Sequence, residues 1–450
     1  MTYDLAITGG TVVGPGGRRQ ANVHVLDGRI AHVGPEGHDA ARTVDATDLL
    51  VLPGMVDTHV HLMDPGPTER EDFPTGTTAA AAAGVTTIVE HTHGHPVREP
   101  ADLRDKRGHL QGRSYVDYGL AAHVWPDRID RLHELWEAGV TFFKIFTCTT
   151  HGVPATEAGA LLPVFTSLAS FGGTALVHCE DEHLTETAEK LLRASGRDDP
   201  AVIVEWRSRE AELIAAATVS LMARLTGARI TVAHVSTPEV AELISRERAA
   251  GADIAAEACP QYFLLREDEI LTNGAFRKFT PPARARTDAD EERMWDLLRR
   301  GVLTHLSTDH APATPEQKRE GSIWDVHFGL PGLDTTLPML LTAAADGHLA
   351  YEDIVRVYAD TPARRYGLHP RKGRIAAGAD ADLVLVDPTA RWVLDDSMVR
   401  SKAGWTPYAG RRVQGRVVAT FLRGHALVED GRLTTDPGGA FIAGPGAARA

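Results

Sequence analysis

The middle of this chain repeats one pattern eight times, and that pattern restricts the fold more than any other feature. Short apolar runs alternate with stretches whose apolar residues recur at helical spacing. This alternation is typical of a parallel sheet built from strand–helix units, and eight such units predict a barrel. The eight predicted strands span residues 55–61, 85–91, 116–124, 141–146, 174–180, 229–236, 252–260 and 303–312. Helices are predicted between them, for example at 127–139, 237–251 and 288–301.

The two ends of the chain differ from the middle. Residues 1–52 contain short alternating or β-branched runs broken by Gly-rich turns, and the same pattern returns near the other end. We therefore expect the two ends to pair into one small β domain beside the barrel. Residues 436–450 are rich in Gly, Ala and Pro, and we expect them to form a flexible tail.

Charge and composition exclude several classes of partner. A net charge of −14 opposes binding to nucleic acid, whose phosphates are neutralised by Lys and Arg. The chain has no apolar run of the 18 or more residues that a membrane span needs. Its first residues lack the pattern of a secretory signal, so we expect a cytoplasmic location. Three cysteines, Cys148, Cys179 and Cys259, are too few for a disulfide framework and are expected to be reduced.

Polar residues stand at the carboxyl ends of several predicted strands, where barrels place their chemistry. Residues two apart in a strand point to the same side, so His59 and His61 can converge on one ion. Imidazole and carboxylate groups suit divalent metals such as Zn²⁺. An isolated pair of histidines is only weak support for a metal site. Further polar residues at the ends of other predicted strands make the prediction of a metal centre much stronger. These residues are Lys144, His178, His234 and Asp309.

Lys144 lies in the run "FFKIF", where burial would lower the pKa of its ammonium group. A neutral amine can react with CO₂, and the resulting carbamate is an anion with two oxygens that can bridge two cations. The alternative is an ordinary core lysine in an ion pair, and the surrounding strand-end ligands favour the carbamate.

A second histidine-rich stretch competes for the metal. "VEHTHGHP" at 89–96 holds His91, His93 and His95 at the end of another predicted strand. Because the first set already fills a site, we interpret His93 as a pocket-wall residue that shapes specificity. A loop of solvated or structural histidines is the alternative, and it is favoured for His95.

Together these residues resemble the cyclic amidohydrolases of the amidohydrolase superfamily, which comprise hydantoinases, dihydropyrimidinases, allantoinases and dihydroorotases. The resemblance covers nearly the whole chain. Its motifs, in order, are "PGMVDTHVHLMDPG", "TGTTAAAAAGVTTIVE", "FFKIF", "HCED", "AHVS", "EACPQY", "FTPPAR", "STDHAP", "LPGLDTTLPM", "GLHPRKGRIAAGADADLVLVDP" and "TPYAGRRVQGRV".

The resemblance implies a fold and a metal centre. It implies an α/β fold with a (β/α)8 TIM barrel over residues 53–369 and a small β-sandwich formed by residues 1–52 and 370–435. It makes His59, His61 and Asp309 ligands of a first divalent metal, His178 and His234 ligands of a second, and carboxylated Lys144 the bridge. Zn²⁺ is the expected metal, with Mn²⁺, Co²⁺ or Fe²⁺ as alternatives. A homo-oligomer, tetramer or dimer, is also implied.

The implied activity is hydrolysis of a carbon–nitrogen bond in a small cyclic amide or ureide. A hydroxide that bridges the metals would attack the amide carbon, with Asp309 as general base and then general acid. We expect a hydantoin-like or allantoin-like ring, and the alternatives are allantoinase proper or a dihydroorotase-like enzyme. A non-enzymatic scaffold of the same family is an alternative of a different class, and a mononuclear deaminase on the same barrel is a weaker one.

The expected substrate contacts depart from the relatives with known rings. Dihydroorotases carry Arg at the position of Met63, where it holds a carboxylate, and D-hydantoinases carry Tyr at Thr149 and Asn at Phe328. Thr280 replaces a Ser whose backbone meets the ring. We expect the substrate to contact Met63, His93, Thr149, His151, Thr280 and Phe328, which match none of the well-known members closely.

Overall fold

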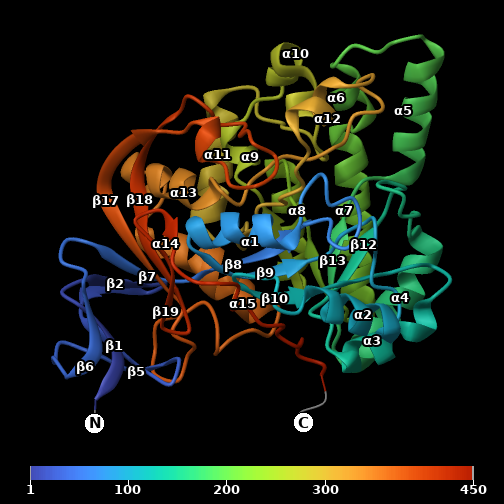
Figure 1. Cartoon of the computed structure of the whole chain (residues 1–450). Coiled ribbons are helices and arrows are strands. Elements are labelled where there is room, and N and C mark those ends of the chain that lie inside the picture. The colour runs from blue at the N-terminus through green and yellow to red at the C-terminus, as the bar shows by residue number, and fades with distance from the viewer. Residues whose placement is uncertain (1, 448–450) are drawn as a thin grey trace.

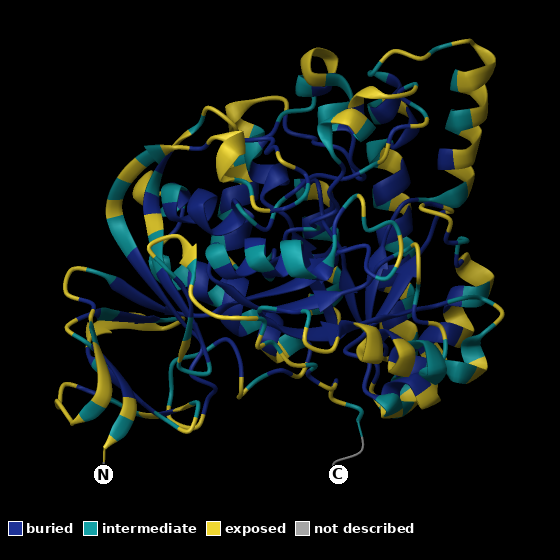
Figure 2. Ribbon diagram, in the orientation of Figure 1, coloured by how far each residue is buried: buried dark blue, intermediate teal, exposed yellow. Residues whose placement is uncertain are grey.

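The computed structural model describes residues 2–447. Short parallel strands lie at its centre with helices around them (Figure 1), and nearly every residue of these strands is buried, whereas the peripheral helices carry exposed residues (Figure 2). Within the described residues, no helix is long and apolar enough to cross a membrane.

The central strands form two parallel sheets, ordered β10-β9-β8 and β11-β12-β13-β14-β15-β16. Each strand lies within one of the eight predicted ranges, with β10 and β11 sharing the third. The strands are β8 (Met55–Val60), β9 (Val85–Glu90), β10 (Asp117–Leu120), β11 (Ala122–His123), β12 (Phe143–Phe146), β13 (Thr174–His178), β14 (Arg229–Val232), β15 (Ile254–Ala258) and β16 (His305–Leu306). The predicted α/β class with parallel strands is confirmed.

Helices follow the strands in the chain, and several of them begin at side-chain caps. Thr237 accepts a hydrogen bond from the Val240 N–H at the start of α8, and Thr287 forms a capping box with Asp290 at the start of α11. The helices are α1 (Phe73–Ala82), α2 (Pro100–Leu110), α3 (Leu132–Ala138), α4 (Ala158–Phe171), α5 (Glu182–Ala194), α6 (Val202–Trp206), α7 (Arg209–Thr226), α8 (Pro238–Ala249), α9 (Gln261–Leu264), α10 (Glu269–Asn273), α11 (Asp288–Arg299), α12 (Pro315–Arg319), α13 (Thr336–Ala345), α14 (Tyr351–Val355) and α15 (Thr361–Arg365).

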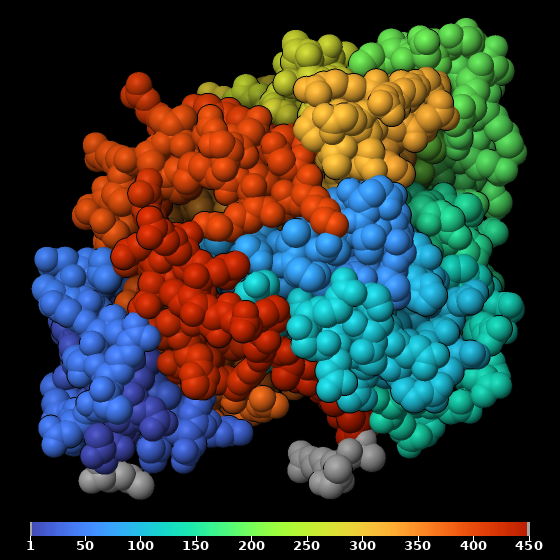
Figure 3. All heavy atoms as spheres, viewed as in Figure 1, coloured from blue at the N-terminus to red at the C-terminus, as the bar shows by residue number. Residues whose placement is uncertain are grey.

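The N-terminal and C-terminal parts of the chain lie side by side (Figure 3). They are joined by an antiparallel pairing of β7, from the N-terminal part, with β17, from the C-terminal part. One sheet has the order β5-β4-β1-β6 and the other β20-β19-β18-β17-β7-β2-β3. Apolar side chains from both sheets, among them Ile7, Val51 and Phe421, form one buried cluster. The strands are β1 (Tyr3–Thr8), β2 (Thr11–Gly14), β3 (Gly17–Gln20), β4 (Asn22–Leu26), β5 (Arg29–Gly34), β6 (Ala40–Asp45), β7 (Leu50–Pro53), β17 (Leu383–Val393), β18 (Arg412–Leu422), β19 (His425–Glu429) and β20 (Arg432–Leu433).

Part of the predicted flexible tail over residues 436–450 makes defined contacts, at residues 439–444, while 448–450 lie outside the described residues. Phe441 forms a parallel β-bridge with Tyr118. The side chain of the next residue, Ile442, is buried. The glycines that suggested mobility instead permit close backbone contact. A Cβ atom on Gly439 would lie 1.9 Å from the Val116 carbonyl oxygen.

Candidate metal centre

The six residues predicted to bind metal lie together at the carboxyl ends of five strands. His59 lies near the end of β8 and His61 directly follows it, Lys144 lies in β12, and His178 ends β13. His234 and Asp309 follow β14 and β16, and both have left-handed backbones, with φ of 37° and 49°. Such backbone conformations cost free energy in non-glycine residues and are typical of functional sites.

His59 and His61 are oriented by partners behind them. The Nδ1–H of His59 donates to Glu257 Oε1 at 2.6 Å, and the Nδ1–H of His61 donates to the His91 carbonyl oxygen at 2.7 Å. A neutral imidazole carries only one proton, so both Nε2 atoms are left with a lone pair. This arrangement fixes the tautomer of each ring in the manner of metal-binding histidines.

The two free lone pairs meet the same anionic oxygen. Oδ1 of Asp309 lies 3.1 Å from Nε2 of His59 and 3.2 Å from Nε2 of His61. Two lone pairs and a carboxylate converge on one point, and a cation there would satisfy all three. The residues therefore fit a bound metal ion.

A second pair of imidazoles lies beside the first. The Nε2–H of His178 donates to Glu180 Oε2 at 2.7 Å, so its Nδ1 faces Nε2 of His234 at 2.9 Å. Nδ1 of His234 has no hydrogen-bond partner among the described residues. The rings of His59 and His234 are 5.5 Å apart, so the two pairs of imidazoles are neighbours.

Lys144 lies between these pairs. Its Nζ is 3.2 Å from Nε2 of His59, and within the described part of the chain no carboxylate is at ion-pair distance from it. Burial lowers the pKa of Lys144 to about 8, although the charges of Asp309 and Glu257 oppose the shift. A substantial share of this lysine is therefore a neutral amine near pH 7.5 to 8.

Replacing Glu257 by Gln is expected to lower zinc affinity by about 10- to 100-fold, because the anion that orients the His59 ring is lost while its shape is kept. Competition with a chromogenic chelator measures this affinity. Glu186→Gln, an exposed change on α5, is the matched control. Equal affinities for the wild type and Glu257→Gln would contradict the orienting role.

A pocket opens onto this group of residues. Its wall contains five of the six predicted substrate contacts together with two predicted metal ligands. The lining residues are His61, Met63, Arg70, His93, His151, Thr280, Asp309, Ala311, Phe328 and Gly329. Thr149 does not line the pocket. Its backbone N–H and its hydroxyl bind the Glu182 carboxylate, and the residue is exposed, so the contact of Thr149 with substrate remains a prediction without support from the pocket wall.

Comparison with known proteins places these features in a family. The model of the amidohydrolase family matches residues 50–427. The chain belongs to the amidohydrolase family. It is 35% identical to an allantoinase of Rubrobacter xylanophilus over 98% of this chain and 97% of the relative, and 33% identical to an Escherichia coli allantoinase over 98% and 99%. L-hydantoinase (dihydropyrimidinase) from Arthrobacter aurescens has a similar structure, with a TM-score of 0.94, 30% identity and coverage of 98% and 100%.

This amidohydrolase contains a second histidine triad beside the predicted ligands. Nitrogen atoms of His91, His93 and His123 lie within 4.8 Å of one another. Burial lowers the pKa of each of the three well below its usual value, so the rings are neutral. In contrast to His59 and His61, the rings of His91 and His123 have no hydrogen-bond partner on either nitrogen among the described residues. The metal prediction stays with His59 and His61, because Glu257 and the His91 carbonyl oxygen orient their rings and both Nε2 atoms meet the Asp309 carboxylate.

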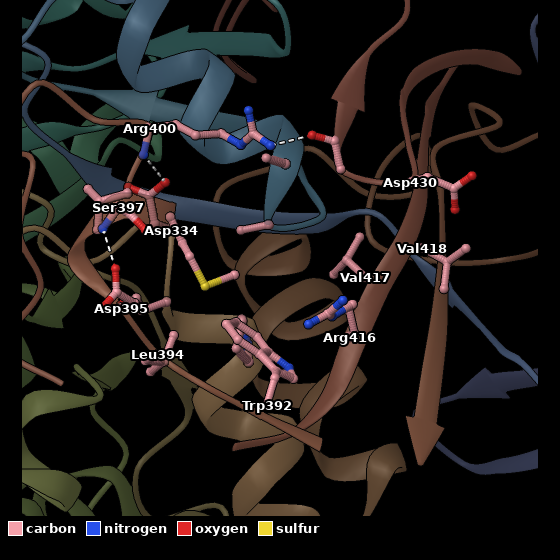
Figure 4. A pocket seen from close by; sticks show the side chains of 17 residues that line it. Asp334, Trp392, Leu394, Asp395, Ser397, Arg400, Arg416, Val417, Val418 and Asp430 are labelled. Carbon is pink, nitrogen blue, oxygen red and sulfur yellow. Dashed lines mark hydrogen bonds between the residues drawn. The ribbon is translucent and has the colours of Figure 1, made fainter. Parts of the chain in front are cut away.

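A larger cavity of the amidohydrolase lies elsewhere, between α13 and strands β17 and β18 (Figure 4). Its wall includes Asp334, Trp392 and Arg416 but none of the predicted ligands or substrate contacts. Choosing the larger cavity as the functional site would be wrong, because the smaller pocket is the one lined by His61 and Asp309.

Sequence reasoning missed several residues that support the site. Asp57 accepts hydrogen bonds from the Tyr358 hydroxyl and the Thr308 backbone N–H, and so ties β8 to the segment that carries Asp309. Glu180 and Glu257 orient His178 and His59. An acidic residue inside an otherwise apolar strand is the signal that could have found Asp57 and Glu257.

Proposed function

We propose that this amidohydrolase is a metal-dependent hydrolase that opens a cyclic amide or ureide, with a ring of the hydantoin or allantoin type. The observation that carries the proposal is the convergence of the His59 and His61 lone pairs on the Asp309 carboxylate, which also lies in the pocket wall. Relatives named as allantoinases and a hydantoinase of similar structure support the ring class.

The proposed cofactor is a pair of divalent cations, Zn²⁺ first and Mn²⁺, Co²⁺ or Fe²⁺ as alternatives. His59, His61 and Asp309 would hold one, His178 and His234 the other, and a carbamate on Lys144 would contact both. Bound cations of this kind lower the pKa of the attacking water and polarise the substrate carbonyl. The buried, unpaired amine of Lys144 supports the carbamate, because only a neutral amine reacts with CO₂.

Asp309 is the proposed proton carrier. Its carboxylate lies both at the histidine pair and in the pocket wall, with 14% of its side chain exposed. It can accept the proton of the attacking water and deliver it to the ring nitrogen that leaves. The side chains of Met63 and Phe328 make part of the wall apolar, and His93 and His151 offer neutral imidazoles to the polar edge of a ring.

The proposed architecture is a closed (β/α)8 barrel over residues 53–369, with residues 1–52 and 370–435 as a β-sandwich. Two isolated parallel bridges support closure, because Val60 pairs with His310 beyond β16 and Val97 beyond β9 pairs with Ala122 of β11. We also propose a homo-oligomer, a tetramer or a dimer, which sedimentation would test.

A hydrolysis screen tests the proposed function. The metal-loaded protein is offered hydantoin, dihydrouracil, allantoin and dihydroorotate, and ring opening is followed by chromatography. Turnover of at least one five-membered ureide is expected. If the metal-loaded protein opens none of these rings, the scaffold alternative holds instead. Allantoin as the best substrate would favour allantoinase proper, which the two allantoinase relatives support.

A further inference from the structure

Three basic side chains lie in the pocket wall or behind it without acidic partners. Arg70 lines the pocket, and Lys278 and Lys318 support the loop that brings Phe328 and Gly329 to its wall. Within residues 2–447, no carboxylate lies at ion-pair distance from any of the three. Arg70 is only half-buried and keeps its charge, so it is the cation among these three that a ligand in the pocket can meet.

The side chain of Arg70 is held in place by a single hydrogen bond. Its Nε–H donates to the Pro312 carbonyl oxygen at 3.0 Å, which leaves the two terminal NH₂ groups of the guanidinium without a partner among the described residues. Burial lowers the pKa of Arg70 to about 10, and the charge of the exposed Glu69 opposes this only in part. Arg70 is therefore a fixed, charged fork with free donors in the pocket wall.

The two lysines bind only carbonyl oxygens. Nζ of Lys278 donates to the carbonyls of Trp324 and Val326 and lies 4.4 Å from the centre of the Phe328 ring. Nζ of Lys318 donates to the carbonyls of Lys278 and His327. Both lysines are buried, which lowers the pKa of Lys278 to about 8 and the pKa of Lys318 well below its usual value. The positive charge at the pocket is therefore mainly that of Arg70.

No other residue in the pocket wall neutralises the positive charge of Arg70. His93 and His151 are neutral because burial lowers their pKa, Met63 and Phe328 are apolar, and the carboxylate of Asp309 is directed at His59 and His61. A ligand with anionic oxygens would supply the missing partner. The guanidinium fork matches the two oxygens of a carboxylate.

We propose that the natural ring carries a carboxylate substituent and that Arg70 binds it. This inference rests on the proposed function, which it narrows to acidic cyclic ureides or amides. The carboxylate clamp that dihydroorotases carry at the position of Met63 is absent, and Arg70 reaches the same pocket from seven residues further along the chain.

A matched pair of substrates tests the proposal. One is a hydantoin with a carboxymethyl group on its ring carbon, and the other bears the corresponding primary amide, which has the same size and no charge. The wild type is expected to use the acid with a kcat/KM about 10- to 100-fold above that of the amide. Arg70→Gln should remove this preference by lowering the value for the acid alone, and Arg70→Lys should keep part of it. Arg104→Gln, on the exposed face of α2, is the control.

Equal use of both compounds by the wild type, or an equal loss for both in Arg70→Gln, would overturn the proposal while leaving the proposed function standing. If the metal-loaded wild type hydrolyses neither compound, it is the proposed function that fails for this ring. Calorimetry on the same protein then decides the role of Arg70. Binding of the acid that weakens about 10-fold or more in Arg70→Gln supports it, and the absence of such binding overturns it.

Discussion

Replacing Asp309 by Asn is expected to lower kcat by about 10³-fold, a loss typical of removing a general acid–base group. Asn has nearly the same shape and keeps one oxygen toward His59 and His61, but it cannot accept the proton of the attacking water or pass it to the ring nitrogen. Steady-state kinetics on the best ring of the hydrolysis screen measures the effect, with the metal content of each preparation recorded.

The exposed Asp105→Asn change on α2 is the matched control and should keep the wild-type kcat. A fall of less than about 10-fold in Asp309→Asn, with both metals bound, would show that another group carries the proton. A large fall that follows metal loss alone would assign Asp309 to metal binding and remove its proton-carrying role.

Replacing Lys144 by Gln is expected to abolish measurable turnover and to leave at most one metal bound per chain. Gln is close to Lys in length and suits the buried position, but its amide cannot form a carbamate. Without that anion, the second pair, His178 and His234, has only neutral nitrogen ligands for a divalent cation. Metal analysis and the ring-opening assay on the same samples measure both effects.

A carbamate on Lys144 would also make metal binding depend on CO₂, which an ordinary lysine would not. Chelated wild-type protein should recover two metals when zinc is supplied with bicarbonate and fewer in CO₂-depleted buffer, whereas Lys144→Gln should respond to neither. Lys190→Gln on the exposed face of α5 is the matched control. Full metal loading of Lys144→Gln would rule out the bridging carbamate.

Much of the fold follows from the sequence because each parallel strand is buried and therefore forms a continuous apolar run. The strand-end residues His59, His61, His178, His234 and Asp309 stand out against these runs, which is why residue type and position predicted that they would lie together. Their hydrogen-bond partners are harder to find. Glu257 lies in the middle of a predicted strand, and only the structure shows that its carboxylate reaches the His59 ring.

Contacts made by loops could not be predicted. Thr149 was expected in the pocket because of its position after Lys144, but the structure turns its hydroxyl toward Glu182. Arg70 gave no signal, because a loop arginine is usually solvated, and only the return of its loop to the Pro312 carbonyl brings it into the wall. The glycines of the last segment suggested mobility, whereas Gly439 permits contact with Val116. Such tertiary contacts depend on how loops return to the sheet, which local pattern does not encode.

The central claim is that catalysis here depends on two metal ions held by the strand-end ligands. Titration of zinc into the chelated protein, with ring opening as the readout and bicarbonate present, tests it most directly. The chelated protein is expected to be inactive and to regain activity up to about two equivalents of zinc per chain, as expected for a two-metal site. Full activity in protein shown to contain no metal would contradict the claim.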